Sequence, residues 1–123
     1  MDYSCIKEVL HSVPGSPTII ASGAMVIRGI LSDASDLDLI VTLEEFRIIS
    51  EMSGSRIILK RFGPCVQVGD IEASTYAGLK DAGRMISWDM IDGMRVQSVE
   101  SLKDLYLSLN RPKDQIKLRL LGL

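Results

Sequence analysis

Hydrophobic positions change from helical to strand spacing early in the chain. Apolar residues recur every three or four positions over residues 6–13 and predict a helix, which the sequence Pro-Gly-Ser-Pro then ends. A β-branched run at 18–21 predicts a buried strand. A short helix over 24–30 is expected after a break at Ser22-Gly23, and a second strand at 36–42. The chain therefore begins as helix, strand, helix, strand.

The middle of the chain is rich in β-forming residues. Thr42 and Glu45 have the spacing of a capping box, so a helix is predicted from there to about residue 52. Residues 56–62 and 65–73 are two β-rich runs, and the Gly63-Pro64 pair between them predicts a hairpin. Over residues 75–90 the pattern is weaker, with only a hint of a helix from Leu79, Ala82 and Met85.

The last part of the chain returns to helical spacing. A short edge strand is expected at 94–99, followed by an amphipathic helix over 102–109. A final helix is expected from Lys113, with Ile116 and Leu120 facing inward. This order of elements predicts a mixed α/β (α+β) fold, a small mixed β-sheet flanked by helices, in a single domain spanning residues 1–123.

Composition narrows the classes of protein that fit. The chain is 46% hydrophobic and 24% charged, with a formal net charge of -2, which argues against a surface that wraps DNA or RNA. It contains no stretch of about 18 uncharged residues, the length that a membrane helix needs. Its first residues lack the basic segment and apolar run of a signal peptide. We therefore expect a cytoplasmic protein without membrane contact.

Cysteine, histidine and isolated cations suggest little chemistry. Cys5 and Cys65 lie far apart without metal-ligand spacing, and we interpret both as reduced core thiols. The single histidine, His11, is expected at the surface, so neither a zinc site nor histidine-dependent catalysis is predicted. Arg28, Lys60 and Arg61 are expected to be solvated surface charges. The chemistry must come from other residues.

Two acids at the start of the second strand are the first candidate site. In a strand, Asp36 and Asp38 face one way while Leu37 and Leu39 face the other. Two adjacent carboxylates repel each other and are costly to bury without a counter-charge. A divalent cation supplies that charge, and magnesium favours one or two carboxylates together with phosphate oxygens. The alternative, two solvated acids at an exposed strand end, is equally compatible with this segment alone.

The small residues at 21–24 offer a second candidate site. A strand, a tight Ser22-Gly23 turn and a helix would let backbone amides approach phosphate oxygens near the positive end of the helix dipole. An ordinary strand-to-helix turn has the same sequence, so this feature acquires meaning only in combination with the acids.

In combination, these segments resemble the signature of the polymerase-β-type nucleotidyltransferase superfamily, a glycine/serine turn, a helix and an acid-x-acid strand. The carboxy-terminal part is similar to small bacterial, archaeal and phage members, with Ser-Leu-Lys-Asp-Leu at 101–105 and Arg-Pro-Lys-Asp at 111–114. The resemblance extends from about Thr18 to the end and implies the nucleotidyltransferase fold.

The resemblance also implies a metal site for Mg²⁺ or Mn²⁺. Asp36 and Asp38 match its first two acids, and a third acid is expected on a neighbouring strand. We favour Glu72, which lies inside an apolar run, with Asp70 as the alternative. The two would share a face in a regular strand, unless Gly69 adds a bulge.

Phosphate-binding residues follow from the same resemblance. Ser22 and Gly23 match the turn that holds the triphosphate, and Ser35 adjoins the acids. Arg111 and Lys113 could reach the phosphates, since arginine and lysine are their natural partners. Alternatively, both are the polar start of a helix; the resemblance favours a binding role for Lys113.

The activity implied is transfer of a nucleoside monophosphate from a nucleoside triphosphate such as ATP to a hydroxyl acceptor, with release of pyrophosphate. The acceptor could be a protein, an RNA or a small molecule. Chains of this size resemble minimal nucleotidyltransferases of toxin–antitoxin pairs, in which a protein partner or a homodimer would hold the acceptor. The alternatives are a catalytically degenerate scaffold of the same fold and an unrelated interaction module.

Overall fold

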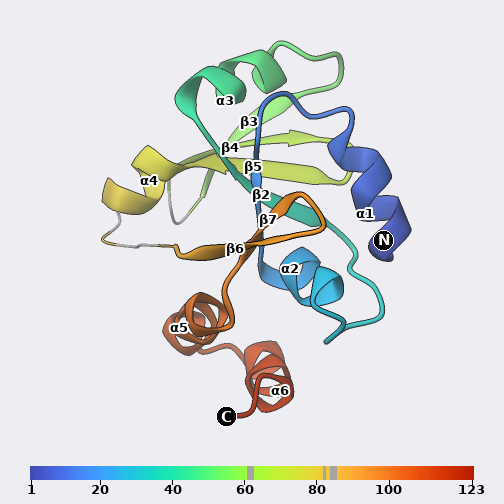
Figure 1. Ribbon diagram of the computed structural model, residues 1–123. Helices are drawn as coiled ribbons and strands as arrows, with labels where there is room; N and C mark the ends of the chain where they lie inside the picture. The colour runs from blue at the N-terminus through green and yellow to red at the C-terminus, as the bar shows by residue number, and fades with distance from the viewer. Residues whose placement is uncertain (61–62, 82, 84–85) are drawn as a thin grey trace.

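The computed structural model describes residues 1–60, 63–81, 83 and 86–123. Over this part of the chain, helices surround one seven-stranded sheet of order β3-β4-β5-β2-β1-β7-β6 (Figure 1). The strands are β1 Thr18–Ile20, β2 Leu37–Val41, β3 Arg56–Lys60, β4 Gly63–Val68, β5 Ile71–Thr75, β6 Trp88–Ile91 and β7 Met94–Gln97. The helices are α1 Tyr3–Leu10, α2 Ala21–Ile27, α3 Leu43–Ser50, α4 Tyr76–Asp81, α5 Val99–Leu109 and α6 Pro112–Leu120.

The sheet is mixed, as the sequence predicted. β1 pairs antiparallel with β2 and parallel with β7, while β2 pairs parallel with β5. β3, β4 and β5 form an antiparallel meander at one side, and β6 and β7 form a hairpin at the other. The two strands that carry the candidate acids, β2 and β5, are therefore neighbours in the middle of the sheet.

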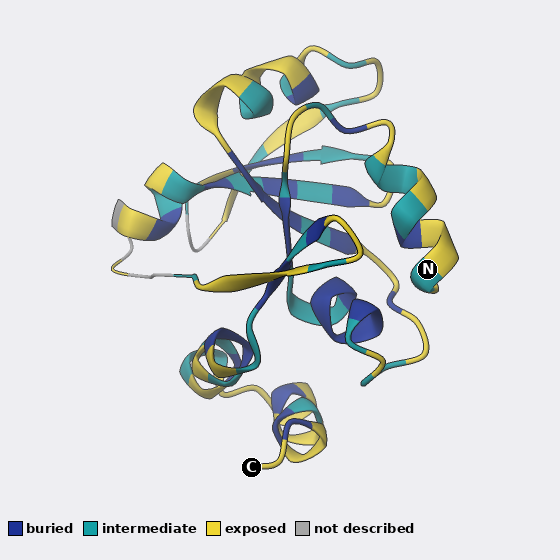
Figure 2. Cartoon of the chain, in the orientation of Figure 1, coloured by how far each residue is buried: buried dark blue, intermediate teal, exposed yellow. Residues whose placement is uncertain are grey.

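Side-chain alternation gives the central strands one apolar face and one partly polar face. In β2, Leu37, Leu39 and Val41 are at most 1% exposed and join the core with residues of α1, α2 and α3. Asp38 lies between them on the opposite face. Figure 2 shows the centre of the sheet buried between helices and the outer strands exposed. The core thus fixes which way the acids point.

Two predicted strands have different boundaries in the structure. The run 65–73 is divided by a reversal at Gly69, whose φ of 56° is accessible to glycine, and Asp70 lies in that turn. The prediction of one continuous strand over 65–73 was therefore wrong: Asp70 lies in the turn and Glu72 in β5. The Gly63-Pro64 pair belongs to β4, and residues 61–62, between β3 and β4, lie outside the described residues.

The strand expected at the sheet edge is an inner strand. β7 lies between β1 and β6, and β6 forms the edge. Asp92 and Gly93 connect β6 to β7 with φ values of 51° and 77°, which is the backbone that a two-residue hairpin needs. An Asp-Gly pair flanked by apolar residues is a hairpin signal that the sequence prediction missed. Within residues 75–90, where the sequence only hinted at a helix, α4 includes Leu79, whereas Ala82 and Met85 lie outside the described residues.

Some predicted side-chain environments also differ. Ile116 and Leu120 are 63% and 49% exposed, and Leu118 and Leu121 are buried in their place. Cys65 is buried as expected, but Cys5 is exposed on α1. Within the described residues, none of the helices is both long and apolar enough to cross a membrane.

The inward face of α6 is set by Asp114 at its first turn. This carboxylate is fully buried and accepts hydrogen bonds from the backbone N–H, Nε and Nη2 of Arg111 at 2.9, 2.8 and 3.0 Å. It therefore caps the helix and orients the Arg111 side chain. Leu118, one turn further along, is buried on the same side. A buried polar residue, rather than the apolar Ile116, decides the orientation of α6.

Asp114→Ala is expected to destabilise the protein by about 2–3 kcal/mol, because it removes a helix cap and charge-assisted hydrogen bonds together. Urea denaturation measures this loss. Asp104→Ala, which removes an exposed acid from α5, is the control and should change stability by less than about 0.5 kcal/mol. A loss for Asp114→Ala as small as the control's would contradict the capping role.

Candidate functional site

The segment predicted as a Ser22-Gly23 turn is the first turn of α2. The helix begins at Ala21, three residues earlier than predicted, because Ala21 takes a φ of 56° and turns the chain straight out of β1. A Cβ on Gly23 would lie 3.0 Å from Leu37 Cδ1 and 3.1 Å from Ile19 Cγ2. Glycine therefore allows α2 to pack closely on the sheet, whereas a larger residue would make the Leu37 and Ile19 side chains give way by a few tenths of an ångström.

The acids occupy adjacent strands. Asp38 of β2 is paired directly with Glu72 of β5 in the parallel ladder, and Asp36 lies exposed just before β2. Together with Ser22 and Ser35 they line a cavity of about 400 Å³, which we call the acidic cavity. Asp70 is not among the lining residues, because it lies in the β4–β5 turn. Of the two candidates for the third acid, Glu72 is the one that faces Asp38.

The acidic cavity concentrates negative charge. Burial and, to a smaller extent, the nearby carboxylates of Glu72 and Asp36 together raise the pKa of Asp38 to about 6. Glu72 is compensated, since its Oε2 lies 2.9 Å from Lys60 Nζ and its Oε1 accepts a hydrogen bond from Gln67 Nε2 at 2.6 Å. Lys60 is therefore more than a solvated surface charge. Among the described residues, no lysine or arginine nitrogen lies within 4.0 Å of either aspartate.

Asp36 and Asp38 suit a divalent cation, because neither is ion-paired with a lysine or arginine of the described residues and both line the same cavity. Glu72 would join them only if it exchanged Lys60 for the metal. Within the part of the chain that the structure describes, no group of three or more histidine, cysteine or acidic side chains is already arranged as a metal cluster. The arrangement offers two free hard oxygen donors and a third held by a lysine, a set that Mg²⁺ or Mn²⁺ favours.

Cationic residues of the carboxy-terminal helix also line the acidic cavity. Arg111, Lys113 and Lys117 come from α6 and its N-cap, and the buried Tyr106 comes from α5. Lys113 is exposed, and Arg111 is bound to Asp114 at the start of the helix. Lys117, Tyr106 and Lys60 were not predicted from the sequence to line this site. Lys117 could have been found from its spacing, since it follows Lys113 by one helical turn.

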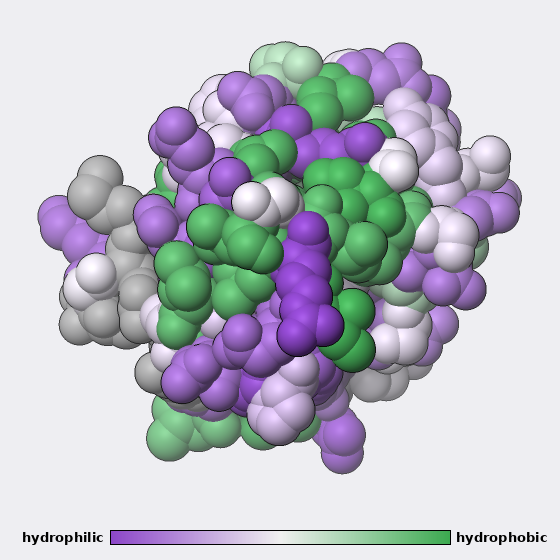
Figure 3. Space-filling view, turned by 90° about the horizontal axis from the view of Figure 1, so that it is seen from below, coloured by the Kyte–Doolittle hydropathy of each residue, from purple (hydrophilic) through white to green (hydrophobic). Residues whose placement is uncertain are grey.

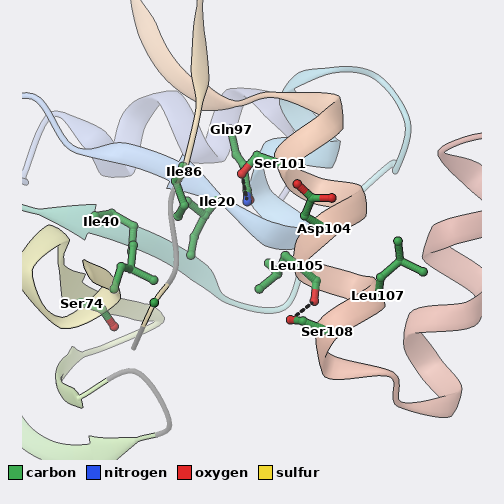
Figure 4. Close-up of a pocket in the computed structure, with 12 residues that line it drawn as sticks. Ile20, Ile40, Ser74, Ile86, Gln97, Ser101, Asp104, Leu105, Leu107 and Ser108 are labelled. Atoms are coloured by element: carbon green, nitrogen blue, oxygen red, sulfur yellow. Dashed lines mark hydrogen bonds between the residues drawn. The ribbon is translucent and has the colours of Figure 1, made fainter. Parts of the chain in front are cut away.

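A second, more apolar cavity adjoins the acidic one. It has a volume of about 560 Å³ and shares Ile20, Ser74 and Leu105 with the acidic cavity. In Figure 4, Ile20 and Ile40 from the sheet and Leu105 from α5 surround this space. Together the two cavities offer a charged end and an apolar end.

Gln97, which lines the apolar cavity, connects α2 to α5 through side-chain hydrogen bonds. Its Oε1 accepts a hydrogen bond from Ala21 N, and its Nε2 donates to Ser101 Oγ, both at 2.9 Å. The Ala21 amide is therefore used within the protein and is not free for phosphate. This buried side chain holds β7, α2 and α5 at one fixed spacing.

Arg28 lies outside both cavities and is more buried than predicted. Its side chain is 15% exposed, bound to Asp89 at 2.7 Å and donating through Nε to the Gln97 carbonyl at 2.9 Å. It joins α2 to the β6–β7 hairpin and serves the fold.

No family model and no curated protein matches this sequence. A solved structure does match: the aminoglycoside nucleotidyltransferase ANT(2″)-Ia in complex with adenylyl-2″-tobramycin, with a TM-score of 0.59 and 20% sequence identity. The match covers 96% of this chain and 86% of that chain. At 20% identity, this likeness shows that the two chains share a fold, the mixed sheet with helices described above. The chain has the nucleotidyltransferase fold.

Proposed function

We propose that this protein is a metal-dependent nucleotidyltransferase that moves a nucleoside monophosphate from a nucleoside triphosphate to a hydroxyl acceptor. The observation that carries the proposal is the acidic cavity, which Asp36, Asp38 and Glu72 line together with Ser22 and the cations of α6. Acids on one side can hold metal, and a hydroxyl and cations on the other can hold phosphate. The shared fold supports the same activity at a coarse level.

Each group has a distinct task in this proposal. Asp36 and Asp38 would hold the cation, and Glu72 would be a third ligand if its pairing with Lys60 were given up. Bound Mg²⁺ or Mn²⁺ would lower the pKa of the acceptor hydroxyl and neutralise charge on the departing pyrophosphate. Ser22 donates a hydrogen bond to the triphosphate, and Gly23 allows the close packing that positions Ser22. Lys113 and Arg111 balance phosphate charge at the exposed rim, with Ser35 near the acids.

The fold neighbour suggests a donor and a class of acceptor. ANT(2″)-Ia was crystallised with adenylyl-2″-tobramycin, an adenylylated small molecule, which supports ATP as donor and a small hydroxyl compound as acceptor. The apolar cavity beside the acids gives room for one of them. Protein and RNA acceptors, the toxin–antitoxin role and a cytoplasmic location stay predictions from the sequence.

A protein partner or homodimer also stays a prediction. Several large apolar side chains of α5, α6 and the carboxy terminus are exposed: Leu107, Ile116, Leu120 and Leu123. Figure 3 views this end of the molecule from below and shows hydrophobic groups on both sides of a strongly hydrophilic strip. Such a surface is compatible with protein contact.

Binding of the four nucleoside triphosphates, each with and without Mg²⁺, tests the proposal. We expect one or more of them to raise the melting temperature and to bind measurably by calorimetry only when the metal is present. Release of pyrophosphate on addition of pooled small hydroxyl compounds would then establish transfer. Absence of metal-dependent binding of any triphosphate would refute the proposal.

Binding without transfer is the second candidate function, and one contact favours it. Lys60 Nζ lies 2.9 Å from Glu72 Oε2, so the third acid is already neutralised by a side chain of the same protein. A scaffold of this kind would bind a nucleotide or a partner without turnover. Metal-dependent triphosphate binding that is accompanied by no pyrophosphate release, whatever the acceptor, would favour this function.

A further inference from the structure

We propose that Lys117, acting with the hydroxyls of Ser22 and Tyr106, binds the phosphate oxygens of the donor triphosphate. This inference rests on the proposed function and names the residues that select a polyphosphate ligand. Neither Lys117 nor Tyr106 belongs to the Arg-Pro-Lys-Asp segment, whose Arg111 also pairs with Asp114.

Lys117 is held in one place although it carries a long, flexible side chain. It extends from the middle of α6 to α2, where Nζ donates a hydrogen bond to Ser22 Oγ at 2.9 Å. The same ammonium lies 4.9 Å from the centre of the Tyr106 ring. Residues separated by 95 positions in the chain thus meet at the wall of the acidic cavity. A cation that is already ordered loses little conformational entropy when it binds an anion.

The environment of Lys117 leaves its charge without an anionic partner. Among the described residues, no carboxylate oxygen lies within 4.0 Å of its ammonium. Desolvation lowers the pKa of Lys117, as expected for a cation that has lost water without gaining a close counter-ion. An ammonium has three donor hydrogens, and one is used by Ser22. The remaining donors and the charge are available to an anion in the cavity.

Tyr106 supplies an independent observation. Its side chain is 1% exposed, and its hydroxyl is the buried side-chain polar atom for which the described residues provide no hydrogen-bond partner. Such an atom costs free energy until an acceptor arrives. Burial, only partly offset by the neighbouring Ser22 hydroxyl, raises the pKa of Tyr106 to about 12, so the Tyr106 hydroxyl stays protonated and can donate. A phosphate oxygen in the acidic cavity would satisfy it.

The charge distribution favours a metal-bound polyphosphate over a simple anion. The Asp36, Asp38 and Glu72 side of the cavity repels a free anion, whereas the Lys117 and Tyr106 side attracts one. A polyphosphate that carries a divalent cation satisfies both sides, because its metal lies against the acids and its free oxygens against the ammonium and hydroxyls. Inorganic tripolyphosphate with Mg²⁺ is therefore the simplest probe.

Calorimetric titration with Mg²⁺-tripolyphosphate and with a non-hydrolysable Mg²⁺-ATP analogue tests this assignment. Lys117→Met is expected to weaken both by about tenfold to a hundredfold, the value of a charge-assisted hydrogen bond. Lys117→Arg should restore most of the affinity, and Tyr106→Phe should lose about threefold to tenfold while keeping the ring. Lys103→Met, which removes the same charge from α5 away from the cavity, should bind like the wild type.

The outcomes separate the two proposals. No binding of either probe to the wild-type protein would refute the nucleotide site as a whole. Wild-type binding that Lys117→Met weakens no more than Lys103→Met would overturn the role of Lys117 alone. Thermal unfolding without ligand controls for misfolding, and Lys117→Met should melt within a few degrees of the wild type. If it melts much lower, the affinities of Tyr106→Phe and the wild type for the two probes are compared instead. Equal affinities would then overturn the proposed phosphate contact.

Discussion

Replacing Asp36 and Asp38 together by asparagine is expected to abolish nucleotide transfer, by at least about a thousandfold, and metal-dependent triphosphate binding with it. The two carboxylates of the acidic cavity have no cationic partner among the described residues, so they are its free oxygen donors for a divalent ion. Asparagine preserves side-chain size but removes the charge that the metal requires. Pyrophosphate release and calorimetry with Mg²⁺ measure the two losses.

The matched control is the double variant Asp33→Asn with Asp70→Asn. It changes the net charge equally, but both residues are exposed and lie outside the acidic cavity. Its binding and activity should remain within about twofold of the wild type. Unchanged Mg²⁺-dependent triphosphate binding in the Asp36→Asn/Asp38→Asn variant would refute the placement of the metal at these acids. If the control variant also lost binding and activity, the effect would be due to net charge and not to these two acids.

Asp38→Asn alone is expected to stabilise the metal-free protein at neutral pH. The pKa of Asp38 in the folded protein is raised to about 6 from an ordinary 3.8, so folding favours its protonated form. The stabilisation that protonated Asp38 gives the folded protein is therefore fully present below pH 3.8 and is lost as the pH rises through 6. The difference corresponds to at most about 3 kcal/mol at pH 7.5. The asparagine variant escapes this loss because it never ionises.

Urea denaturation at pH 4 and pH 7.5, without metal, measures the effect. The variant should exceed the wild type in unfolding free energy by about 1–3 kcal/mol at pH 7.5 and converge with it near pH 4. Asp33→Asn, at an exposed position, is the control and should shift little at either pH. A variant that is less stable than the wild type at pH 7.5 would contradict an uncompensated Asp38. Saturating Mg²⁺ should stabilise the wild type and not the variant.

Features that depend on neighbours within a few residues were predictable from sequence. The Thr42 and Glu45 capping box forms as expected, because both partners belong to one helical turn. The alternation of Asp36, Leu37 and Asp38 placed the leucine in the core and the acids together on the polar side. The Asp92-Gly93 hairpin was equally local and could have been predicted, but its signal was overlooked.

The local sequence could not decide whether Asp70 or Glu72 is the third acid. A regular strand would have put both on one face, and only the reversal at Gly69 moves Asp70 into a turn. The β2–β5 register then sets Glu72 beside Asp38. Register depends on packing between strands far apart in the chain, which no single segment encodes.

The sequence by itself determined most helices and strands, the mixed α/β class, and the acids and small residues that make up the candidate site. These follow from periodicity, capping and side-chain chemistry, which act over a few residues. Only the tertiary structure decided that Lys60 neutralises Glu72, that Asp114 rather than Ile116 orients α6, and that Lys117 reaches Ser22. Such contacts join distant segments, and they depend on how the whole sheet and its helices pack together.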